Sequence, residues 1–381
     1  MVTDSISMVL LGDLPARMKT AGADVFVVSS PGERLDRAAA AHGFTAVPVA
    51  MRRNLSPLRD VRSIVALVGA LRRIRPDLVD TGTPKAGLLG TIAARLAGTP
   101  FTIYRLRGLR LEAEHGWRRG LLLATERVAG RLADVVVVVS PSLRDQAIAL
   151  RLAPAEKLVV LGSGAFRGVD LERFSATPAA LAAAADHRRE LAIETDDAVV
   201  GFVGRFSRSK GIGALLDAFA IVRRDHPTAH LVLIGDQDES EPISAGDQAR
   251  LDGTDGVHHV PWSADTPSWF AAMDLVVLPS RREGFPSVPI EAAGLDKPCV
   301  AFRATGTVDA VLDGVTGLLV DQGDITGLAG AINRYVDDPA LARRHGAAAH
   351  ERAVAEFEAE SVQQRHVEFL VARLGDRAAR T

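Results

Sequence analysis

The chain of 381 residues is too long for one ordinary hydrophobic core and has the length of two domains. With 47% hydrophobic and 24% charged residues it has the composition of a soluble globular protein, which excludes disordered and fibrous classes. The formal net charge is −2, yet residues 1–195 hold 27 Lys and Arg against 19 Asp and Glu (+8), and the other residues hold 18 against 28 (−10). The two halves are therefore expected to attract different partners.

Cysteine usage and the N-terminus predict a cytoplasmic protein. The single cysteine, Cys299, lies in the apolar run KPCVAF and is expected to be a buried strand residue. One cysteine excludes an intramolecular disulfide, which agrees with a reducing compartment. The N-terminus lacks a basic start followed by a long apolar stretch, and no apolar run has the length of a bilayer span.

The first half of the chain alternates between predicted strands and helices. Strands are predicted at residues 6–11, 25–29, 47–49, 101–104, 135–139 and 158–161. Ser56 and Pro57 are predicted to open a helix whose apolar residues recur on one face, namely Leu58, Val61, Ile64, Val65, Val68 and Leu71. Such βαβ alternation predicts a parallel sheet that is covered by helices on both faces.

Positive charge gathers around that helix. The arginines are Arg52, Arg53, Arg59, Arg62, Arg72, Arg73 and Arg75. Two interpretations stay open: a solvated helix face, or a basic patch that faces anionic lipid headgroups or a lipid-diphosphate acceptor.

A second helix start lies at residues 82–85, where Thr83 is a good N-cap and Pro84 suits the first helical position. Lys85 in the first turn opposes the helix dipole, which suggests an anionic partner, although an ordinary capped helix explains the rest. The strand at 101–104 then leads into three alternating arginines, Arg105, Arg107 and Arg110. They follow a strand end, where open α/β sheets bind ligands, and a salt-bridged surface loop is the alternative.

Residues 175–185 are Ala-rich and are interpreted as the connection between two domains, with a helix of its own. Strands then return at residues 199–203, 231–234, 258–260, 275–278, 300–302 and 318–320. We therefore predict an N-terminal domain at 1–175 and a C-terminal domain at 190–356. A final helix at about 357–381 is expected to pack back on the first domain.

Two segments of the second half indicate a phosphate site. Arg205 and Lys210 lie in a glycine-bounded loop at a helix start and could converge on one diphosphate, or be two exposed cations. Further on, a buried strand, a glycine loop and a helix start carry Glu283 and Glu291, eight positions apart. Carboxylates beside an anion site need hydroxyl partners, and a phosphate flanked by polyols is a sugar nucleotide. A surface glutamate pair is the alternative.

These segments resemble the retaining glycosyltransferases of family 4, whose Glu-x7-Glu signature corresponds to Glu283 and Glu291. VGRFSRSKGI is similar to the diphosphate loop of that family, and REGFPSVPIEA with TGTVDAVLDGVTGLLV to its donor site. GTPKAGLLG, YRLRGLRLE and GSGAFRGVD resemble the branch that assembles capsule, O-antigen or other glycans on lipid-linked acceptors. The resemblance implies an α/β chain with the GT-B fold, in which two Rossmann-like domains face a donor cleft.

The resemblance also implies residue roles. Arg205 and Lys210 would stabilise the donor diphosphate, Glu283 would contact the donor sugar, and these are the expected catalytic residues. Glu291 would hold the ribose, backbone N–H groups of Ser287 and Val288 would meet the phosphate, and Pro261 and Trp262 would lie against the base. Gly12, Gly204, Gly284 and Phe285 complete the expected donor site. The expected acceptor or cleft residues are Thr83, Lys85, Arg105, Arg107 and Arg110.

Some positions depart from the family pattern. Many members carry a histidine where this chain has Arg107, so the role of that histidine passes to Arg107 or stays vacant. Arg167 stands where the branch usually has asparagine, which leaves contacts there open. The triplet at residues 236–238 matches an Asp-x-Asp metal motif of another fold and is interpreted as a polar loop. No metal site and no cofactor are expected, and His42, His115, His187 and His226 lack metal-ligand spacing.

The sequence thus predicts a retaining, metal-independent transferase that moves an N-acetylhexosamine from a UDP-sugar to a lipid-linked or glycan acceptor. An anionic membrane surface, reached through the basic N-terminal domain, is a further candidate partner, which would place the protein on the inner face of the cell membrane. No nucleic-acid partner is expected. Two alternatives remain: a UDP-sugar epimerase on the same fold, and a non-catalytic sugar-nucleotide-binding partner of a membrane transferase.

Overall fold

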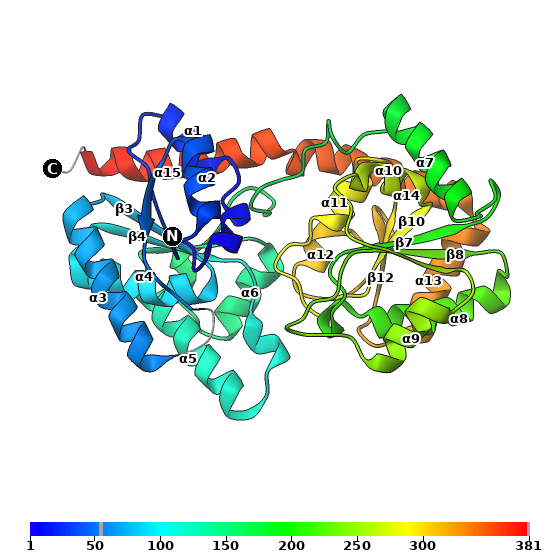
Figure 1. The fold of residues 1–381 in the computed structure, drawn as a ribbon, viewed down its shortest axis with the longest axis horizontal. Coiled ribbons are helices and arrows are strands. Elements are labelled where there is room, and N and C mark those ends of the chain that lie inside the picture. The colour runs from blue at the N-terminus through cyan, green and yellow to red at the C-terminus, as the bar shows by residue number, and fades with distance from the viewer. Residues whose placement is uncertain (53–55, 379–381) are drawn as a thin grey trace. The chain divides into compact units, whose positions relative to one another are not determined.

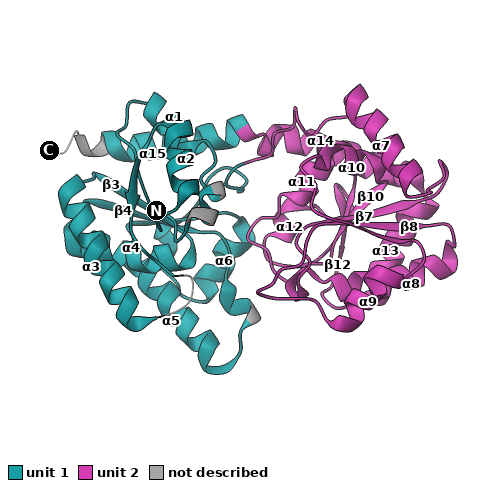
Figure 2. Ribbon diagram, viewed as in Figure 1, with its two compact units in different colours: residues 1–167, 360–381 teal, residues 168–359 magenta. Residues whose placement is uncertain are grey.

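The structure, a computed structural model, describes residues 1–52 and 56–378, and the chain forms two compact units (Figures 1 and 2). Unit 1 consists of Met1–Arg167 and Glu360–Thr381, and unit 2 of Gly168–Ala359. The division lies before residue 175, because Val169 pairs with the far end of unit 2: its N–H donates to Phe357 O (2.8 Å), and its carbonyl accepts from Ala359 N (3.0 Å). The Ala-rich segment contains the expected helix, but that helix belongs to unit 2 and does not connect the two units.

Unit 1 is built on parallel strands, as expected. They are β1 (Phe26–Ser29), β2 (Thr45–Pro48), β3 (Leu78–Gly82), β4 (Phe101–Leu106), β5 (Val135–Val138) and β6 (Leu158–Val160). β1 pairs with β2, and the other four form a sheet in the order β3-β4-β5-β6. Residues 1–3 join the two sheets, because Val2 N donates to Val28 O and Gly82 N donates to Met1 O, each at 3.0 Å.

Helices cover both faces of the parallel sheet in unit 1. They are α1 (Leu14–Thr20), α2 (Glu33–His42), α3 (Pro57–Ile74), α4 (Pro84–Ala97), α5 (Gly116–Leu132), α6 (Pro141–Ala149) and α15 (Ala359–Ala378), with the short helices η1 (Ser5–Leu10), η2 (Arg110–Ala113) and η3 (Ala155–Lys157). One core contains Leu67 of α3 and Leu89 of α4 with Val79 of β3. Another contains Leu370 of α15 with Ile103 of β4. The C-terminal helix is thus part of the core of the first unit.

The strand predicted at residues 6–11 is wrong. These residues lie in η1, which begins directly after Asp4. The Asp4 carboxylate accepts hydrogen bonds from the Ser7 N–H at 2.9 Å and from the Ser7 hydroxyl at 3.0 Å. An acidic cap of this kind satisfies the first free N–H groups of a helix and favours a helical turn over an extended chain.

Helix α3 does not bury the whole apolar face that its sequence predicted. Ser63, Leu67 and Leu71 face the core, whereas Leu58, Val61 and Val65 are 83%, 60% and 67% exposed. The arginines of this region are exposed at positions 52, 59, 62, 72, 73 and 75, and Arg53 lies outside the described residues. Within the part of the chain that is described, no helix has the length and apolar character needed to cross a bilayer.

Unit 2 contains one parallel sheet in the order β12-β11-β10-β7-β8-β9. Its strands are β7 (Val199–Val203), β8 (His230–Ile234), β9 (Val257–Val260), β10 (Leu275–Leu278), β11 (Cys299–Phe302) and β12 (Gly317–Val320). β8 and β9 lie on one side of β7, and β10 begins the other side. The sheet therefore reverses its strand order between β7 and β10, and such switch points are where open α/β sheets bind ligands.

The helices of unit 2 enclose that sheet. They are α7 (Pro178–Glu190), α8 (Ile212–Asp225), α9 (Ala245–Gly253), α10 (Thr266–Ala272), α11 (Val288–Ala293), α12 (Thr307–Ala310), α13 (Ile325–Asp337) and α14 (Pro339–Arg352), with η4 (Arg208–Lys210) and η5 (Ala353–Phe357). One core packs Phe219 of α8 and Ile332 of α13 against Phe202 of β7. Cys299 is buried in β11, as predicted, and burial raises the pKa of its thiol to about 12.

Candidate active site

Two loops of unit 2 meet at the switch point of its sheet. The loop after β7 carries Arg205 and Lys210, and the loop after β10 carries Glu283. Lys210 Nζ lies 2.5 Å from Glu283 Oε1, and both side chains are largely buried. Gly211 makes the approach possible: it adopts φ +75°, and a Cβ there would lie 2.1 Å from Pro279 O. The structure thus brings together a cation and a carboxylate that the sequence placed in one site.

An acidic loop after β8 contacts the same region. Arg205 is ion-paired with Asp238, although the Arg205 side chain is 72% exposed. The Ser240 hydroxyl and Arg205 hold the pKa of Asp238 below its usual range. Glu241 accepts a hydrogen bond from Ser209 Oγ at 2.9 Å. The cations that were predicted to bind a diphosphate therefore have carboxylate partners in this structure, Asp238 for Arg205 and Glu283 for Lys210.

Helix α11 begins at Val288, and its cap is Ser287. The carbonyl of Ser287 accepts the first helical hydrogen bonds, from Ile290 N (2.9 Å) and Glu291 N (2.8 Å), so the N–H groups of Ser287 and Val288 precede the helical ladder. Glu291 is half-buried in the first turn. The helix has six residues, and its dipole contributes correspondingly little.

The other expected donor residues of unit 2 surround these loops. Gly204 follows β7 with φ +153°. A Cβ on Gly306 would lie 2.3 Å from Gly284 O, so the absence of a side chain at residue 306 lets the 283–284 segment approach it. The Phe285 ring lies 5.0 Å from the ring of the buried Phe357. Pro261 and Trp262 follow β9, and the Trp262 side chain is 67% exposed, so it is not a packing residue of unit 2.

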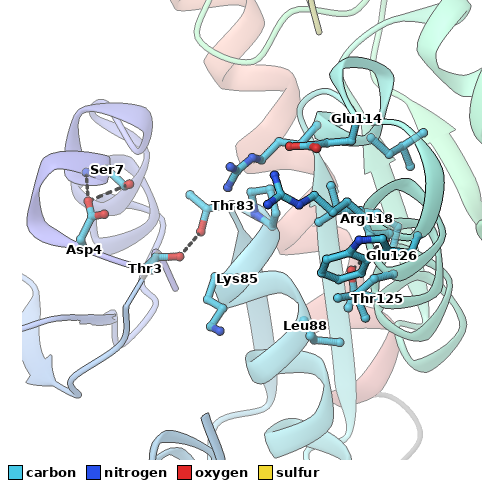
Figure 3. A pocket seen from close by; sticks show the side chains of 16 residues that line it. Thr3, Asp4, Ser7, Thr83, Lys85, Leu88, Glu114, Arg118, Thr125 and Glu126 are labelled. Carbon is cyan, nitrogen blue, oxygen red and sulfur yellow. Dashed lines mark hydrogen bonds between the residues drawn. The ribbon is translucent and has the colours of Figure 1, made fainter. Parts of the chain in front are cut away.

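The expected acceptor residues of unit 1 fall into two groups. Thr83, Lys85 and Arg110 line one cavity of about 610 Å³ (Figure 3). The anionic partner predicted for Lys85 is Asp60 of α3, whose carboxylate lies 2.5 Å from Lys85 Nζ. Lys85 is only 7% exposed, so its cation is held inside the unit.

The side chains of Arg105 and Arg107 form the second group and point into the interior of unit 1. Arg105 is 2% exposed, and its Nε donates to both oxygens of Asp80, at 2.8 and 2.7 Å. Burial would raise the pKa of Asp80, but the Arg105 guanidinium holds it below its ordinary value. Burial also lowers the pKa of Arg107 to about 9, and its guanidinium stacks 3.8 Å from the centre of the Phe166 ring. Arg105 thus forms a structural ion pair with Asp80, whereas Arg107 is half-buried just after the end of β4.

Gly12 belongs to unit 1. Its φ of +51° suits glycine, and a Cβ on it would lie 3.6 Å from Arg167 Nε. Arg107 donates to Leu10 O in the same segment at 3.2 Å. Gly12 therefore lies close to the two positions where the sequence departs from the family pattern.

Sequence reasoning missed Glu126, which lines the cavity of unit 1 and is 7% exposed. Tyr104 donates a hydrogen bond of 2.6 Å to Glu126 Oε2. Burial raises the pKa of Glu126 to about 7, and the Tyr104 hydrogen bond opposes that rise in part. A glutamate on an amphipathic helix ordinarily faces solvent, so no local pattern marked this residue. Among the residues that the structure describes, no group of three or more His, Cys, Asp or Glu side chains is arranged to hold a metal ion.

Two parallel-sheet units, the second with a cation–carboxylate loop pair at its switch point, agree with the GT-B glycosyltransferase class that the sequence predicted. Two family models match the chain: "Glycosyl transferases group 1" over residues 184–352 and "Glycosyl transferase 4-like domain" over residues 10–164. The chain is 31% identical over 362 residues to the capsular polysaccharide biosynthesis glycosyltransferase CapM of Staphylococcus aureus, covering 95% of this chain and 93% of CapM. The protein belongs to the group 1 glycosyltransferases.

Two further proteins are similar over most of the chain. A UDP-Gal:alpha-D-GlcNAc-diphosphoundecaprenol alpha-1,3-galactosyltransferase of Escherichia coli is 26% identical over 294 residues, covering 76% of this chain and 74% of that enzyme. The crystal structure of Anabaena Alr3699/HepE in complex with UDP-glucose superposes with a TM-score of 0.78 at 25% identity, covering 96% of this chain and 95% of HepE. The predicted fold class and glycosyltransferase activity are confirmed.

The buried Glu126 predicts a pH-dependent stability difference. Its pKa is about 7 when folded against an ordinary 4.5, so between those pH values the folded state binds more protons and the free energy of unfolding falls as pH rises. A pKa difference of that size corresponds to roughly 3 kcal/mol. Because Glu126→Gln does not titrate and keeps an acceptor for Tyr104, the variant should gain stability over wild type from pH 4.5 to 7 and no more above it.

Urea denaturation at a series of pH values measures this gain. Glu156→Gln, which replaces an exposed glutamate of the same unit, is the matched control and should track wild type. A constant difference between Glu126→Gln and wild type across the series would contradict a buried, protonated Glu126.

Proposed function

We propose that this protein is a retaining glycosyltransferase that transfers a sugar from a UDP-sugar to a hydroxyl acceptor without a metal ion. The observation that carries the proposal is the Lys210–Glu283 pair at the switch point of unit 2, with Arg205 in the same loop. The likeness to HepE, whose crystal structure contains UDP-glucose, supports a UDP-sugar donor. The likeness to CapM supports a role in polysaccharide assembly.

The proposed chemistry needs fixed positive charge more than it needs a nucleophile. The transition state has oxocarbenium character, and negative charge grows on the departing UDP. Arg205 and Lys210 offset that charge, Glu283 hydrogen-bonds the donor sugar, and the leaving phosphate takes the acceptor proton. Glu291 binds the ribose hydroxyls, and the Ser287 and Val288 N–H groups meet a phosphate oxygen. Pro261 and the exposed Trp262 are the proposed contacts of the base.

Donor binding exchanges the partners of both cations. In the structure Lys210 is paired with Glu283 and Arg205 with Asp238. A diphosphate offers each cation a second set of negative oxygens, and Arg can donate two parallel hydrogen bonds to them in a forked geometry. Glu283 is then released from its ion pair, which frees its oxygens for the sugar hydroxyls.

We propose an N-acetylhexosamine as the donor sugar and a lipid-linked or polysaccharide intermediate as the acceptor. The acceptor proposal is supported by the cavity of unit 1 and by the E. coli relative, whose name describes a diphosphoundecaprenol acceptor. A UDP-sugar epimerase would convert UDP-N-acetylglucosamine without any acceptor. A non-catalytic binding partner would convert no UDP-sugar, with or without an acceptor. Incubation of the protein with UDP-N-acetylglucosamine alone separates the epimerase from the transferase.

We further propose a peripheral position on the inner, cytoplasmic face of the membrane. Leu58, Val61 and Val65 form one exposed stripe along α3, and the exposed Arg59 and Arg62 flank it. Apolar side chains beside arginines suit insertion at the surface of an anionic bilayer. The stripe adds an apolar component to the basic patch that the sequence indicated.

Thermal shift measures donor binding. UDP at 100 times its dissociation constant should stabilise the protein by roughly 2.7 kcal/mol, which raises the unfolding midpoint. Lys210→Ala should remove most of this rise, because it deletes a cation from the diphosphate site. Arg208→Ala changes an exposed cation of the same loop and should leave the rise intact. A rise with GDP or NAD but not with UDP would count against the proposed donor.

The stereochemistry of transfer tests the retaining mechanism. The product should keep the anomeric configuration of the donor, which the ¹H NMR coupling of the anomeric proton reports. Glu283→Gln should lower kcat/KM about 100-fold, as expected when a fixed polar contact to a transition state is lost. Intact-mass analysis of the wild type during turnover should find no sugar bound to residue 283. A covalent adduct there would replace this mechanism with double displacement.

Vesicle sedimentation tests the membrane position. Vesicles with anionic lipid should pull the protein down at low salt and release it at high salt, because charge attraction is screened. The variant Leu58→Asp with Val61→Asp should stay in solution, since it places negative charge in the stripe. Val371→Asp, at an exposed valine of α15, is the matched control and should sediment as wild type does. Equal sedimentation of both variants would rule the stripe out.

A further inference from the structure

A cavity of about 610 Å³ lies wholly within unit 1 and has the size of a small-molecule site (Figure 3). Four segments form its walls: residues 3–7, the start of α4, residues 110–114, and one face of α5. Hydroxyl, carboxylate and cationic groups line it together with the apolar side chains Leu88, Leu111, Leu121 and Leu122. This mixture suits a polar ligand that also presents carbon surface, as a pyranose ring does.

Two charged residues on the wall of this cavity are more than nine-tenths buried. Lys85 and Glu126 are each 7% exposed. Lys85 is ion-paired with Asp60, and Glu126 accepts a hydrogen bond from Tyr104. Burial of such groups is unfavourable unless they are paired, so these partners compensate the burial and hold both groups in place on the cavity wall.

Backbone strain marks the same cavity. Thr83 has φ +80° and ψ 141°, a conformation that a β-branched residue rarely adopts. Its hydroxyl is hydrogen-bonded to that of Thr3 at 2.7 Å, and its carbonyl accepts from Gly87 N at 2.7 Å. These bonds hold the strained residue with its hydroxyl group on the cavity wall, and strain of this kind clusters at ligand sites.

Two arginines at the rim remain available for a ligand. Arg110 and Arg118 are exposed and line the cavity, and neither forms an ion pair or hydrogen bond with any residue that the structure describes. Figure 3 shows Arg118 extending toward Thr83 across the cavity. Of the carboxylates that line the cavity, Glu114 lies midway between the two arginines along the chain, whereas Asp4 lies on the opposite wall and accepts from Ser7. The rim thus offers two guanidinium groups, whose forked N–H donors suit an anion such as phosphate.

We propose that this cavity binds a sugar phosphate, with the pyranose hydroxyls on Thr3, Thr83 and Glu126 and the phosphate on Arg110 and Arg118. The inference rests on the proposed function, and it assigns to the acceptor a phosphate attached directly to its sugar. Glu126 is protonated up to about pH 7 because of its raised pKa, so it can donate to a sugar oxygen while it accepts from Tyr104. A lipid-linked sugar diphosphate and a free sugar phosphate share this chemistry.

Calorimetric titration of the full-length protein tests the proposal. The probes are N-acetylglucosamine 1-phosphate, dodecyl-diphosphate-linked N-acetylglucosamine below its micelle concentration, and the neutral methyl N-acetylglucosaminide. At least one phosphorylated probe should bind tenfold or more tightly than the neutral sugar. Binding of the free phosphate identifies a soluble acceptor, and binding of the dodecyl probe alone identifies a lipid-linked one; both results support the cavity.

Variants locate the binding. Arg110→Gln and Arg118→Gln should each weaken the phosphorylated probe about tenfold and leave the neutral sugar unchanged. Arg119→Gln is the matched control, since Arg119 is the exposed neighbour on α5 that does not line the cavity. The proposal is overturned if no phosphorylated probe binds better than the neutral sugar, or if Arg119→Gln weakens it as much as Arg118→Gln does.

A thermal-shift measurement of UDP binding distinguishes a failure of the acceptor inference from a failure of the proposed function. The thermal rise with UDP depends on Lys210 of unit 2 and should be the same in Arg118→Gln and in wild type. If UDP stabilises the protein through Lys210 while sugar phosphates fail to bind, the acceptor inference is wrong and the transferase proposal stands. If sugar phosphates bind and UDP does not, the cavity is correct and the donor assignment is wrong.

Discussion

The candidate active site depends on the close approach of two loops at the point where the sheet of unit 2 reverses its strand order. Parallel strands bring the loops that follow them to one edge, so Lys210 and Glu283 meet although 73 positions separate them. Gly211 sets how near the loops come, because a side chain there would collide with Pro279 O. The chemistry of the site thus follows from a backbone constraint.

Unit 1 uses charge in a different manner. The Arg105–Asp80 pair joins β4 to β3 in the interior, and Arg105 Nη1 also lies 3.0 Å from Nδ1 of His366 in α15. Lys85 and Asp60 likewise join α4 to α3. Buried pairs of this kind add little net stability, but loss of one partner leaves an uncompensated charge, so they oppose alternative packings. Lys85 and Arg105, which the sequence assigned to the acceptor cleft, therefore form internal ion pairs.

The parallel sheets were predictable because buried strands appear as short apolar runs; β10 spans the predicted 275–278. The same signal failed at residues 6–11, where the Asp4 cap outweighs apolar content. Spacing on α3 could not show that Leu58 and Val61 lack a covering element. In the candidate site, Lys210 and Glu283 were assigned separately to ligand groups, whereas their mutual pairing is a tertiary contact. The burial of Glu126 could not be predicted from its local sequence, since it depends on a hydrogen bond from Tyr104 in another element.

The position of α15 has a consequence for synthesis on the ribosome. Leu370 and Val367 of this helix cover Ile103 and Val137 in the core of unit 1, and all of unit 2 separates them in the chain. While residues 168–359 are translated, the first unit carries an uncovered apolar face. Unit 2 is contiguous and can fold first, so the N-terminal unit is the last to complete its core. In the meantime its surface needs protection from aggregation, and a chaperone that binds apolar nascent chains would supply it.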